Sequence, residues 1–347
     1  MATYKGIQGY SVQKLSSDPT ASEAAGQLFY NSTEGKFKLA TESGGTWSSG
    51  GTMNLARAFG GTAGIQTAAT LAGGEGPGQP SPNTDQAVVE TYNGTAWTEV
   101  NNLLTARKRN AGIGTQTAML SPGGYTPAPG AVSVTLDVES FDGTSWTEGN
   151  NVNTRRASAG AAGTNTAGLV YAGVYTAPGV PATVYQSCES WNGTSWTEVN
   201  DMNTARGNVA GAGTQTAAFV AGGGLPDGTD FANTELFDGT SWTETNDMGT
   251  ARYHVTGCGT TTAALLYGGA TSEVGLKLTE QWNGTSWTEV ADLGTGRYGI
   301  QSATSGTTSA ALAAGGYPGF PVGGPSKTPI TEEWVSPVYS IKTVTTS

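Results

Sequence analysis

The sequence TELFDGTSWTETNDMGTAR, residues 234–252, recurs along the chain with few changes and decides its fold. Its core, Gly-Thr-Ser-Trp-Thr-Glu, is repeated around tryptophans that lie 45 to 50 residues apart, with a looser copy at residues 44–47. These tryptophans are Trp47, Trp97, Trp146, Trp196, Trp242 and Trp287. An arginine follows each of them by about ten residues, at Arg57, Arg107, Arg156, Arg206, Arg252 and Arg297. A repeat of this length indicates an array of similar structural units.

Each repeat is typical of four short β-strands, a to d. In the fourth full copy we expect strands at residues 208–213, 217–222 and 234–237, and a last strand that begins at residues 240–242. An Asp-Gly or Asn-Gly pair separates strands c and d in five copies, which is a strong hairpin signal. The Gly and Ala residues of strand a suit the crowded strand nearest a propeller axis. Four strands per period match one propeller blade.

The two ends of the repeat array complement each other. Residues 297–334 supply strands a, b and c but no following Gly-Thr-Ser-Trp, whereas residues 44–47 supply a strand d alone. Joining them closes a ring and removes two open edges. We therefore predict an all-β, six-bladed β-propeller whose last blade is completed by the N-terminal strand around Trp47. The predicted organisation is an attachment segment with a β-hairpin at 1–40, the propeller at 41–337, and a strand-like tail at 338–347.

Two resemblances follow from these residues. An apolar strand that ends in Gly-Gly, then an aromatic residue, a turn, a tryptophan and Met-x-x-Ala-Arg, as at Met202–Arg206, resembles the kelch repeat over residues 44–335. It implies a kelch-type β-propeller. The segment GQLFYNSTEGKFK, residues 26–38, is similar to a hairpin of tail-fibre and other virion proteins of marine, especially cyanobacterial, bacteriophages. That second resemblance implies a kelch-like structural protein of the virion.

Charge and composition limit the partners. The net charge is −11 and the isoelectric point is near 4.5, so we expect no nucleic-acid partner. Residues 1–30 lack a signal-peptide pattern, and no apolar run approaches the ~20 residues that span a bilayer. The expectation is a virion protein made in the host cytoplasm, without membrane insertion. Cys188 and Cys258 are interpreted as buried free thiols, because their spacing suits neither a disulfide framework nor a metal site.

Catalysis is not expected. Copper enzymes that resemble galactose oxidase need paired histidines, and this chain has one histidine, His254, which we interpret as a core or channel residue. A sialidase needs clustered arginines, whereas most arginines here occupy the repeat position. We therefore predict no catalytic residue, no metal and no cofactor. The six repeated arginines, the six tryptophans and six glutamates are interpreted as structural, with Arg–Glu bonds that tie the blades. The glutamates are Glu90, Glu139, Glu189, Glu235, Glu280 and Glu332.

Binding is expected where the copies differ. The connections between strands b and c vary most, and aromatic residues beside carboxylates there suit a saccharide or a protein. The candidates are Tyr125, Tyr175, Phe231, Asp227, Asp230, Tyr317 and Phe320. The alternative is loop variation without any ligand. Irregular residues of strand a are expected to line the axial opening, namely Lys108, Arg109, Arg155, Tyr253 and Tyr298.

Three functions fit these observations. The first is a non-enzymatic phage virion protein that contacts other virion proteins, or copies of itself, through its termini. The second is an adhesin or tail-fibre module that binds a host-surface glycan. The third is an intracellular adaptor that binds a soluble host protein. Retention in purified particles distinguishes the first hypothesis from the third, and saturable glycan binding identifies the second.

Overall fold

The computed structural model of the chain describes residues 12–20, 26–77, 84–128, 131–271, 274–319, 327–336 and 338–344. Every regular element in this described part is a β-strand. The chain divides into two compact units, Met1–Thr46 with Ser336–Ser347, and Trp47–Val335. The sequence prediction treated the two chain ends as separate segments. In the structure a strand from each end pairs with the other, and both ends lie in one unit.

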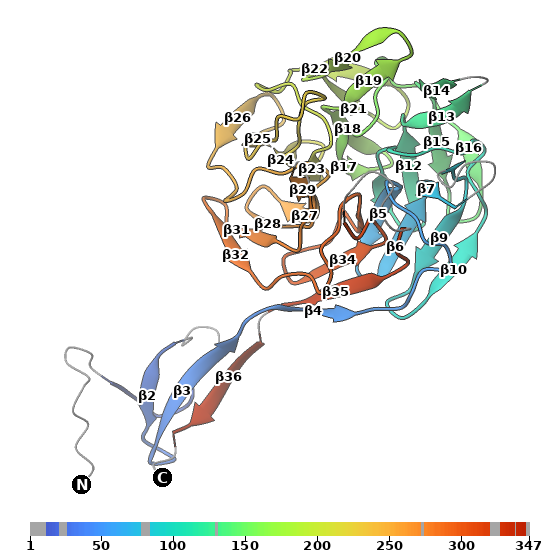
Figure 1. Cartoon of the computed structure of the whole chain (residues 1–347). Helices are drawn as coiled ribbons and strands as arrows, with labels where there is room; N and C mark the ends of the chain where they lie inside the picture. Colours follow the sequence, from blue (N-terminus) through green and yellow to red (C-terminus); the bar gives the residue numbers. More distant parts are fainter. Residues whose placement is uncertain are drawn as a thin grey trace. The chain divides into compact units, whose positions relative to one another are not determined.

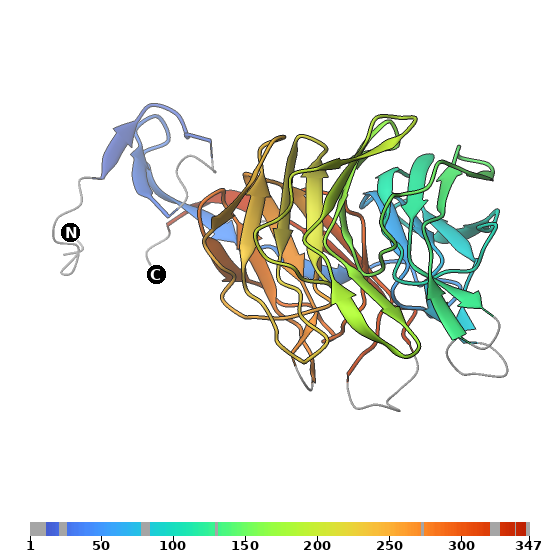
Figure 2. The same cartoon turned by 90° about the horizontal axis from the view of Figure 1, so that it is seen from above.

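The larger unit is a propeller of six four-stranded antiparallel sheets, which Figures 1 and 2 show along and across the ring. Blades 1 to 3 contain β5 (Gly61–Ile65), β6 (Ala68–Ala72), β9 (Val89–Tyr92) and β10 (Trp97–Val100); β11 (Ile113–Thr115), β12 (Ala118–Pro122), β15 (Val138–Phe141) and β16 (Trp146–Glu148); and β17 (Gly160–Thr164), β18 (Ala167–Tyr171), β21 (Cys188–Trp191) and β22 (Trp196–Val199). The innermost strands β5 and β17 carry the small residues that the sequence places nearest the axis.

Blades 4 to 6 complete the ring. They contain β23 (Ala210–Thr214), β24 (Ala217–Ala221), β25 (Thr234–Phe237) and β26 (Trp242–Thr245); β27 (Thr256–Thr260), β28 (Ala263–Tyr267), β31 (Thr279–Trp282) and β32 (Trp287–Val290); and β33 (Gln301–Ser302), β34 (Ala310–Ala314), β35 (Thr331–Val335) and β4 (Thr46–Ser49). In the last sheet the order is β33-β34-β35-β4, so a strand from the start of the chain closes the blade. The predicted six-bladed propeller and its closure around Trp47 are confirmed.

The repeated tryptophans of strand d lie between neighbouring blades. The indole N–H of Trp97 donates to Thr331 of blade 6 at 2.9 Å, and that of Trp287 donates to Thr234 of blade 4 at 3.0 Å. Trp47 makes the equivalent bond to Thr279 of blade 5, also at 3.0 Å. These three contacts hold strand d of blades 1, 5 and 6 against strand c of the preceding blade, whereas Trp146 and Trp196 donate to the backbone carbonyls of Asn101 and Asn150.

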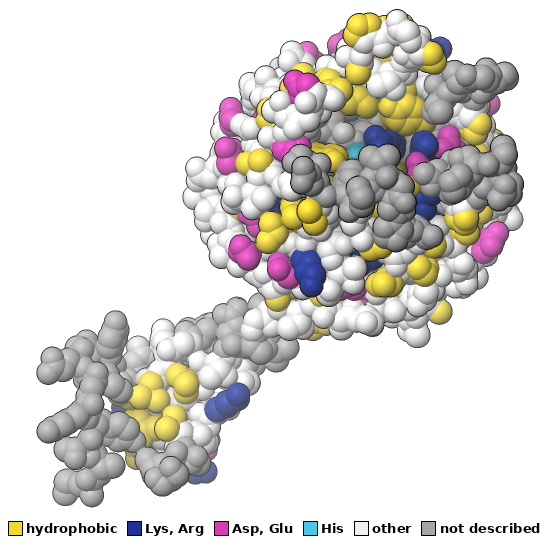
Figure 3. All heavy atoms as spheres, viewed as in Figure 1, with side chains coloured by type: hydrophobic (Ala, Val, Ile, Leu, Met, Phe, Trp, Pro, Cys, Tyr) yellow, Lys and Arg dark blue, Asp and Glu magenta, His cyan; other side chains and the backbone are white. Residues whose placement is uncertain are grey.

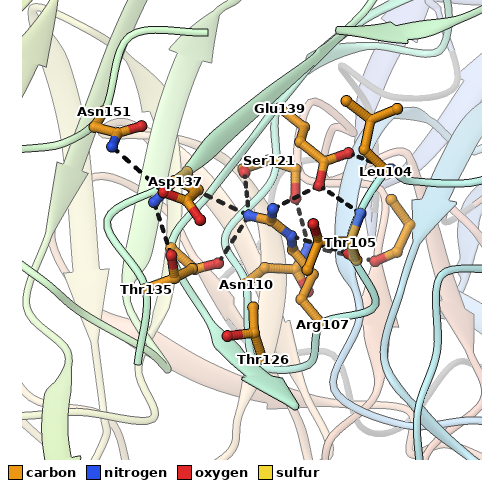
Figure 4. Close-up of polar contacts among 12 residues, drawn as sticks. Leu104, Thr105, Arg107, Asn110, Ser121, Thr126, Thr135, Asp137, Glu139 and Asn151 are labelled. Carbon is orange, nitrogen blue, oxygen red and sulfur yellow. Dashed lines mark hydrogen bonds and ion pairs between the residues drawn. The ribbon is translucent and has the colours of Figure 1, made fainter. Parts of the chain in front are cut away.

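One arginine in each blade is buried completely and bound from several sides, as Figure 4 shows for Arg107. Its guanidinium donates to the carbonyl oxygens of Ser121, Gly123 and Asp137, and to Glu139 Oε1 at 2.6 Å. The other blades repeat the ion pair at 2.8–3.2 Å, as Arg57–Glu90, Arg156–Glu189, Arg206–Glu235, Arg252–Glu280 and Arg297–Glu332. Burial lowers the pKa of Arg57 to about 10, so this arginine is charged at neutral pH.

The main chain of the same arginines links adjacent blades. The carbonyl oxygen of Arg107 accepts from Gly74 N–H of blade 1 at 2.8 Å, while its side chain lies in blade 2. The same bond recurs around the ring, and at the closure Gly316 N–H donates to the carbonyl of Arg57 at 3.0 Å. Each arginine therefore joins its own blade to the preceding one through its main chain. The Arg–Glu bonds, which the sequence analysis interpreted as ties between blades, lie instead within one blade, as for Arg107 and Glu139.

The turns between strands c and d are held by an Asn or Asp side chain. In blade 3, Asn192 Oδ1 accepts from the backbone N–H of Thr194 and Ser195 at 2.9 and 2.8 Å, and Asp142 makes the same two bonds in blade 2. Gly193 has φ +92°, which glycine adopts without strain.

We expect Asn192→Asp to leave stability within about 0.5 kcal/mol, because Asp142 and Asp238 make the same bonds in blades 2 and 4. Asn192→Ala should cost about 1 kcal/mol, because it removes the oxygen that accepts both N–H groups. Urea unfolding followed by circular dichroism measures both values. Equal losses in the two variants would contradict the role of this oxygen.

The connections between strands b and c differ from the expected loops. Among the described residues, four of them contain short two-stranded ribbons, β7–β8 (Glu75–Gly76, Thr84–Asp85), β13–β14 (Tyr125–Ala128, Ala131–Val134), β19–β20 (Val174–Ala177, Val180–Val184) and β29–β30 (Ala270–Thr271, Val274–Gly275). Backbone pairing gives these insertions fixed registers, such as Tyr125 opposite Val134. The variable segments are therefore hairpins that present side chains in a defined way.

The smaller unit is one sheet in the order β1 (Gln13–Leu15), β2 (Leu28–Asn31), β3 (Lys36–Ser43) and β36 (Val338–Thr343). One face carries buried Phe29 and Ala40, with Leu15 and Ile341 packed against them. Lys38 is buried on the same face, where it binds Asp18 at 2.6 Å and Glu34 at 2.5 Å. The predicted hairpin at residues 26–38 is the β2–β3 pair.

Candidate functional site

The b–c face of the propeller brings one bridge from every blade around the axis. In each blade the residue after the repeated arginine pairs with the first residue of the b–c connection. The six pairs are Ala58–Glu75, Lys108–Tyr125, Ala157–Val174, Gly207–Gly224, Tyr253–Ala270 and Tyr298–Tyr317. Large and charged side chains occur in blades 1, 2, 5 and 6, and only small aliphatic residues or glycine in blades 3 and 4. The large and charged side chains therefore lie on one side of this face, although its backbone repeats in every blade. We call it the one-sided face.

The next residue of each blade forms an inner ring in the left-handed backbone conformation. We call these six the ring positions: Phe59, Arg109, Ser158, Asn208, His254 and Gly299, with φ between 52° and 61°. Their main chains bond in series, for example Arg109 N–H to the Phe59 carbonyl at 2.6 Å and Ser158 N–H to the Arg109 carbonyl at 2.8 Å. Phe59 N–H in turn donates to the Gly299 carbonyl at 3.0 Å, across the closure of the ring.

Aromatic side chains gather on the one-sided face. The ring centroid of Phe59 lies 4.7 Å from His254, 5.9 Å from Tyr317 and 6.1 Å from Tyr298. Tyr298 and Tyr317 stack at 5.2 Å with 14° between their planes. Tyr253 contacts His254 at 4.8 Å. We call these five residues the axial aromatic cluster.

Charged groups border this cluster. Lys108 binds Glu75 at 2.9 Å and Asp85 at 3.1 Å, and Lys327 lies 3.5 Å from Glu75. The Tyr317 hydroxyl donates to Glu75 as well. Burial, and then this bond to a carboxylate, raise the pKa of Tyr317, so its hydroxyl keeps its proton. Figure 3 shows Lys and Arg side chains near the centre of this face.

Arg109 lies within the same group. Its guanidinium carbon is 4.6 Å from the centroid of the Phe59 ring, which is a cation–π contact. In the described part of the chain, Arg109 forms no ion pair, whereas Lys108 next to it has two carboxylate partners. Arg109 thus contributes a positive charge that no described carboxylate neutralises.

His254 is neutral at physiological pH in this setting. Burial among the rings, and then the charge of Arg109, lower the pKa of its imidazole well below the usual value. A neutral imidazole offers one N–H donor and one acceptor.

This pKa predicts a dependence of stability on pH. In the unfolded chain the histidine binds a proton below about pH 6.5, but in the folded chain it resists protonation, so stability falls as the pH falls below that value. We expect the wild type to lose up to about 1.4 kcal/mol per pH unit relative to His254→Asn between pH 6 and 5. Urea unfolding across this range tests it, and parallel curves for the two proteins would contradict it.

The structure separates the predicted site residues into three groups. Tyr317 belongs to the axial aromatic cluster. Tyr125 and Tyr175 lie on neighbouring ribbons, where the Tyr125 hydroxyl bonds to Thr176 Oγ1 at 2.8 Å. Asp227, Asp230 and Phe231 lie on the blade 4 connection.

That blade 4 connection is partly structural. Asp227 is exposed and accepts from Thr229 N–H at 2.9 Å, which is a turn contact. The backbone of Phe231 bonds to Gly223 and Arg252. Phe320 lies outside the described residues.

The predicted axial residues need two corrections. Arg109 lines the opening, and Lys108, Tyr253 and Tyr298 border it, but all four precede strand a, which begins three to five residues later. Arg155 is exposed and does not line the opening, because the neighbouring Arg156 is the buried repeat arginine. His254 lines the opening as predicted, also just before its strand. Cys188 and Cys258 are buried free thiols, as expected.

Sequence reasoning missed several members of the site. Phe59, Ser158 and Asn208 were not selected, although each lies two residues after a repeat arginine. That fixed offset, with a different residue in every copy, is the signal that could have found them. Glu75 and Lys327 gave no such signal, because they approach the axis from the b–c connections of different blades.

The fold and this face define the protein as a six-bladed β-propeller. A solved structure titled "Structure of YjhT" is similar, with a TM-score of 0.68 over 85% of this chain and 100% of its own, at 12% sequence identity. This likeness concerns the fold alone. No protein-family model and no curated protein matches the chain. Within the described residues there is no helix suited to crossing a membrane, and no group of three or more His, Cys, Asp or Glu residues placed to hold a metal ion.

Proposed function

We propose that the protein is a non-enzymatic structural component of a bacteriophage virion. In this proposal the smaller unit, Met1–Thr46 with Ser336–Ser347, attaches the chain, and the propeller is displayed. We call this smaller unit the end unit. The proposal includes the kelch character of the repeat, which the motif at residues 202–206 supports. The observation that carries it is the smaller sheet, built from both ends of the chain. The strands of this sheet belong to no blade, so attachment through them uses no strand of the propeller.

This sheet has an apolar face that its own core does not use. Register pairs Leu28 with Leu39 and Tyr30 with Phe37, so these four residues lie on the face opposite Phe29 and Ala40. Tyr30 and Phe37 are in contact at 5.1 Å, and Phe37 is 41% exposed. Figure 3 shows a hydrophobic patch on this unit. A small sheet gains stability when such a face packs against a partner, and exposed apolar patches mark interaction sites.

The test is retention in the particle. Quantitative mass spectrometry of gradient-purified particles of the phage that encodes the chain should find it at a fixed ratio to the other virion proteins, also after a high-salt wash. Phe37→Asp should reduce its incorporation about tenfold or more, because it places a charge on the apolar face. Leu104→Asp is the matched control, since Leu104 is an exposed apolar residue of the propeller, 61% exposed. Absence from the washed particles would refute the proposal.

A second candidate function is the binding of a host-surface glycan by the b–c face. Tyr125 and Tyr175 present half-buried rings on adjacent ribbons, and Asp230 lies on the same face. Aromatic rings beside carboxylates suit a saccharide. Tyr125→Ala should abolish saturable binding on a glycan array, with Tyr30→Ala in the end unit as the control. Equal binding by both variants would exclude a site at Tyr125.

A further inference from the structure

The ring positions surround a hollow on the propeller axis. Its volume is about 120 Å³, and all six blades contribute to its wall. Much of the wall is glycine and alanine from the start of strand a, such as Gly61, Gly112 and Ala161. A hollow of this volume has room for a few water molecules or one small organic molecule. The polar groups on its wall decide which ligand would fit.

Five of the six ring positions carry a side chain at a backbone conformation that favours glycine. Gly299 shows that glycine fits this ring, with φ +61°. A non-glycine residue there costs about 1 kcal/mol or more, and such strain concentrates at ligand sites. Blades 1 to 5 nevertheless place five different side chains there. The difference between copies indicates that these side chains have a purpose other than stabilising the ring.

Three polar side-chain atoms of the wall have no hydrogen-bond partner among the residues that the structure describes. Ser158 Oγ and Asn208 Oδ1 are buried and make no hydrogen bond within the described chain, and the same holds for Asn110 Oδ1. All three residues line the hollow. A buried polar atom without a partner costs about 1–3 kcal/mol, so a ligand that bonds to these atoms recovers that energy. Such a ligand needs both hydrogen-bond donors and acceptors.

The charge of the wall favours an anion. Arg109 lines the hollow without a described carboxylate partner, and His254 beside it is neutral. A guanidinium matches the two oxygens of a carboxylate with parallel hydrogen bonds. Asn208 Oδ1 is an acceptor, so it needs a donor that a carboxylate does not have. A hydroxyl group on the same ligand supplies it.

We propose that the axial hollow binds a small hydroxycarboxylate, with its carboxylate on Arg109 and its hydroxyl on Asn208 and Ser158. This site is separate from the end unit and does not depend on the proposed virion role. The Phe59 ring holds the guanidinium of Arg109 by its face and so helps to orient it.

Three probes of similar size test the ligand class by titration calorimetry and ligand-observed NMR on the full chain. Lactate carries both groups, propionate lacks the hydroxyl, and 1,2-propanediol lacks the carboxylate. We expect saturable lactate binding, propionate binding weaker by at least about fivefold from the loss of the hydroxyl's bonds to Asn208 and Ser158, and no saturable binding of the diol. No saturable lactate binding, or equal binding of all three probes, would overturn the proposal.

Variants that copy the glycine of blade 6 test the residues. Arg109→Gly and Asn208→Gly reproduce Gly299, so the ring conformation is retained, and circular dichroism checks the fold. Arg109→Gly should weaken lactate binding about 30-fold or more, and Asn208→Gly about fivefold. Arg155→Gly, at an exposed arginine, should have no effect. Arg109→Asn, which tolerates positive φ, replaces the glycine variant if that variant unfolds. Unchanged lactate binding in either Arg109 variant would refute the assignment.

Discussion

Replacing Arg107 by methionine is expected to lower the free energy of unfolding by about 3–5 kcal/mol, with a fall in Tm of roughly 6–12 °C. The guanidinium is fully buried and bonds three carbonyl oxygens and Glu139. Methionine fills part of the space but leaves the Glu139 carboxylate buried without its cation. The main-chain tie to Gly74 persists, because it uses the arginine carbonyl. Thermal unfolding followed by circular dichroism measures the loss.

Two further variants separate the ion pair from general effects of the substitution. Arg155→Met changes an exposed arginine and should alter stability by about 0.5 kcal/mol or less. The double variant Arg107→Met/Glu139→Leu should be more stable than Arg107→Met, because it also removes the uncompensated charge. The carbonyl oxygens, and the N–H groups of Leu104 and Thr105 that Glu139 accepts from, still lose their partners. A loss in Arg107→Met no larger than in Arg155→Met would show that the buried pair does not stabilise the blade.

Removing β4 should abolish the cooperative fold of the propeller. Two chains make the comparison, residues 46–336, which keep β4, and residues 51–336, which lack it. We expect the longer chain to unfold in one cooperative transition, because Trp47–Val335 is a compact unit with all six blades. The shorter chain should lose at least about 10 °C in Tm or fail to fold, because it lacks Trp47 and leaves β35 as an open edge.

The contacts of Trp47 explain the size of this effect. Its ring lies 4.7 Å from Tyr267 and 5.6 Å from Trp334, and its indole N–H binds Thr279. It therefore joins blade 5 to blade 6 at the point where the ring closes. Equal melting temperatures for the two chains would contradict closure by the N-terminal strand.

The fold could be predicted almost completely from the sequence, because the same pattern of strand and turn residues occurs in six copies. Strand c of blade 4 was predicted at residues 234–237 and is found there. Strand a of the same blade was predicted to begin at residue 208 and begins at Ala210. The physical reason is the ring position Asn208, whose φ of 58° ends the extended conformation. A non-glycine residue at positive φ leaves no clear mark in a sequence.

The candidate site was only partly predictable. The b–c face and Tyr317, Arg109 and Tyr298 were foreseen from the variation between copies. Phe59 was not, because its contact with Tyr317, 5.9 Å away, exists only when the two ends of the ring meet. Arg155 was predicted to line the axial opening, but it is exposed beside the buried Arg156. The sequence of two consecutive arginines does not show which way each side chain points. Pairings across blades, such as Lys327 with Glu75, depend on loop paths that composition does not specify.

The most direct test of the assembly role is the mass of the full chain in solution by light scattering, measured beside the chain of residues 46–336. If the end unit mediates assembly, the full chain forms oligomers at micromolar concentration, while the shorter chain is a monomer. Phe37→Asp in the full chain should then reduce the oligomer fraction, since Phe37 lies on the exposed apolar face. Monomeric behaviour of both chains would contradict self-assembly through the end unit. If the full chain and the shorter chain have the same oligomeric state, whatever it is, the end unit does not mediate assembly.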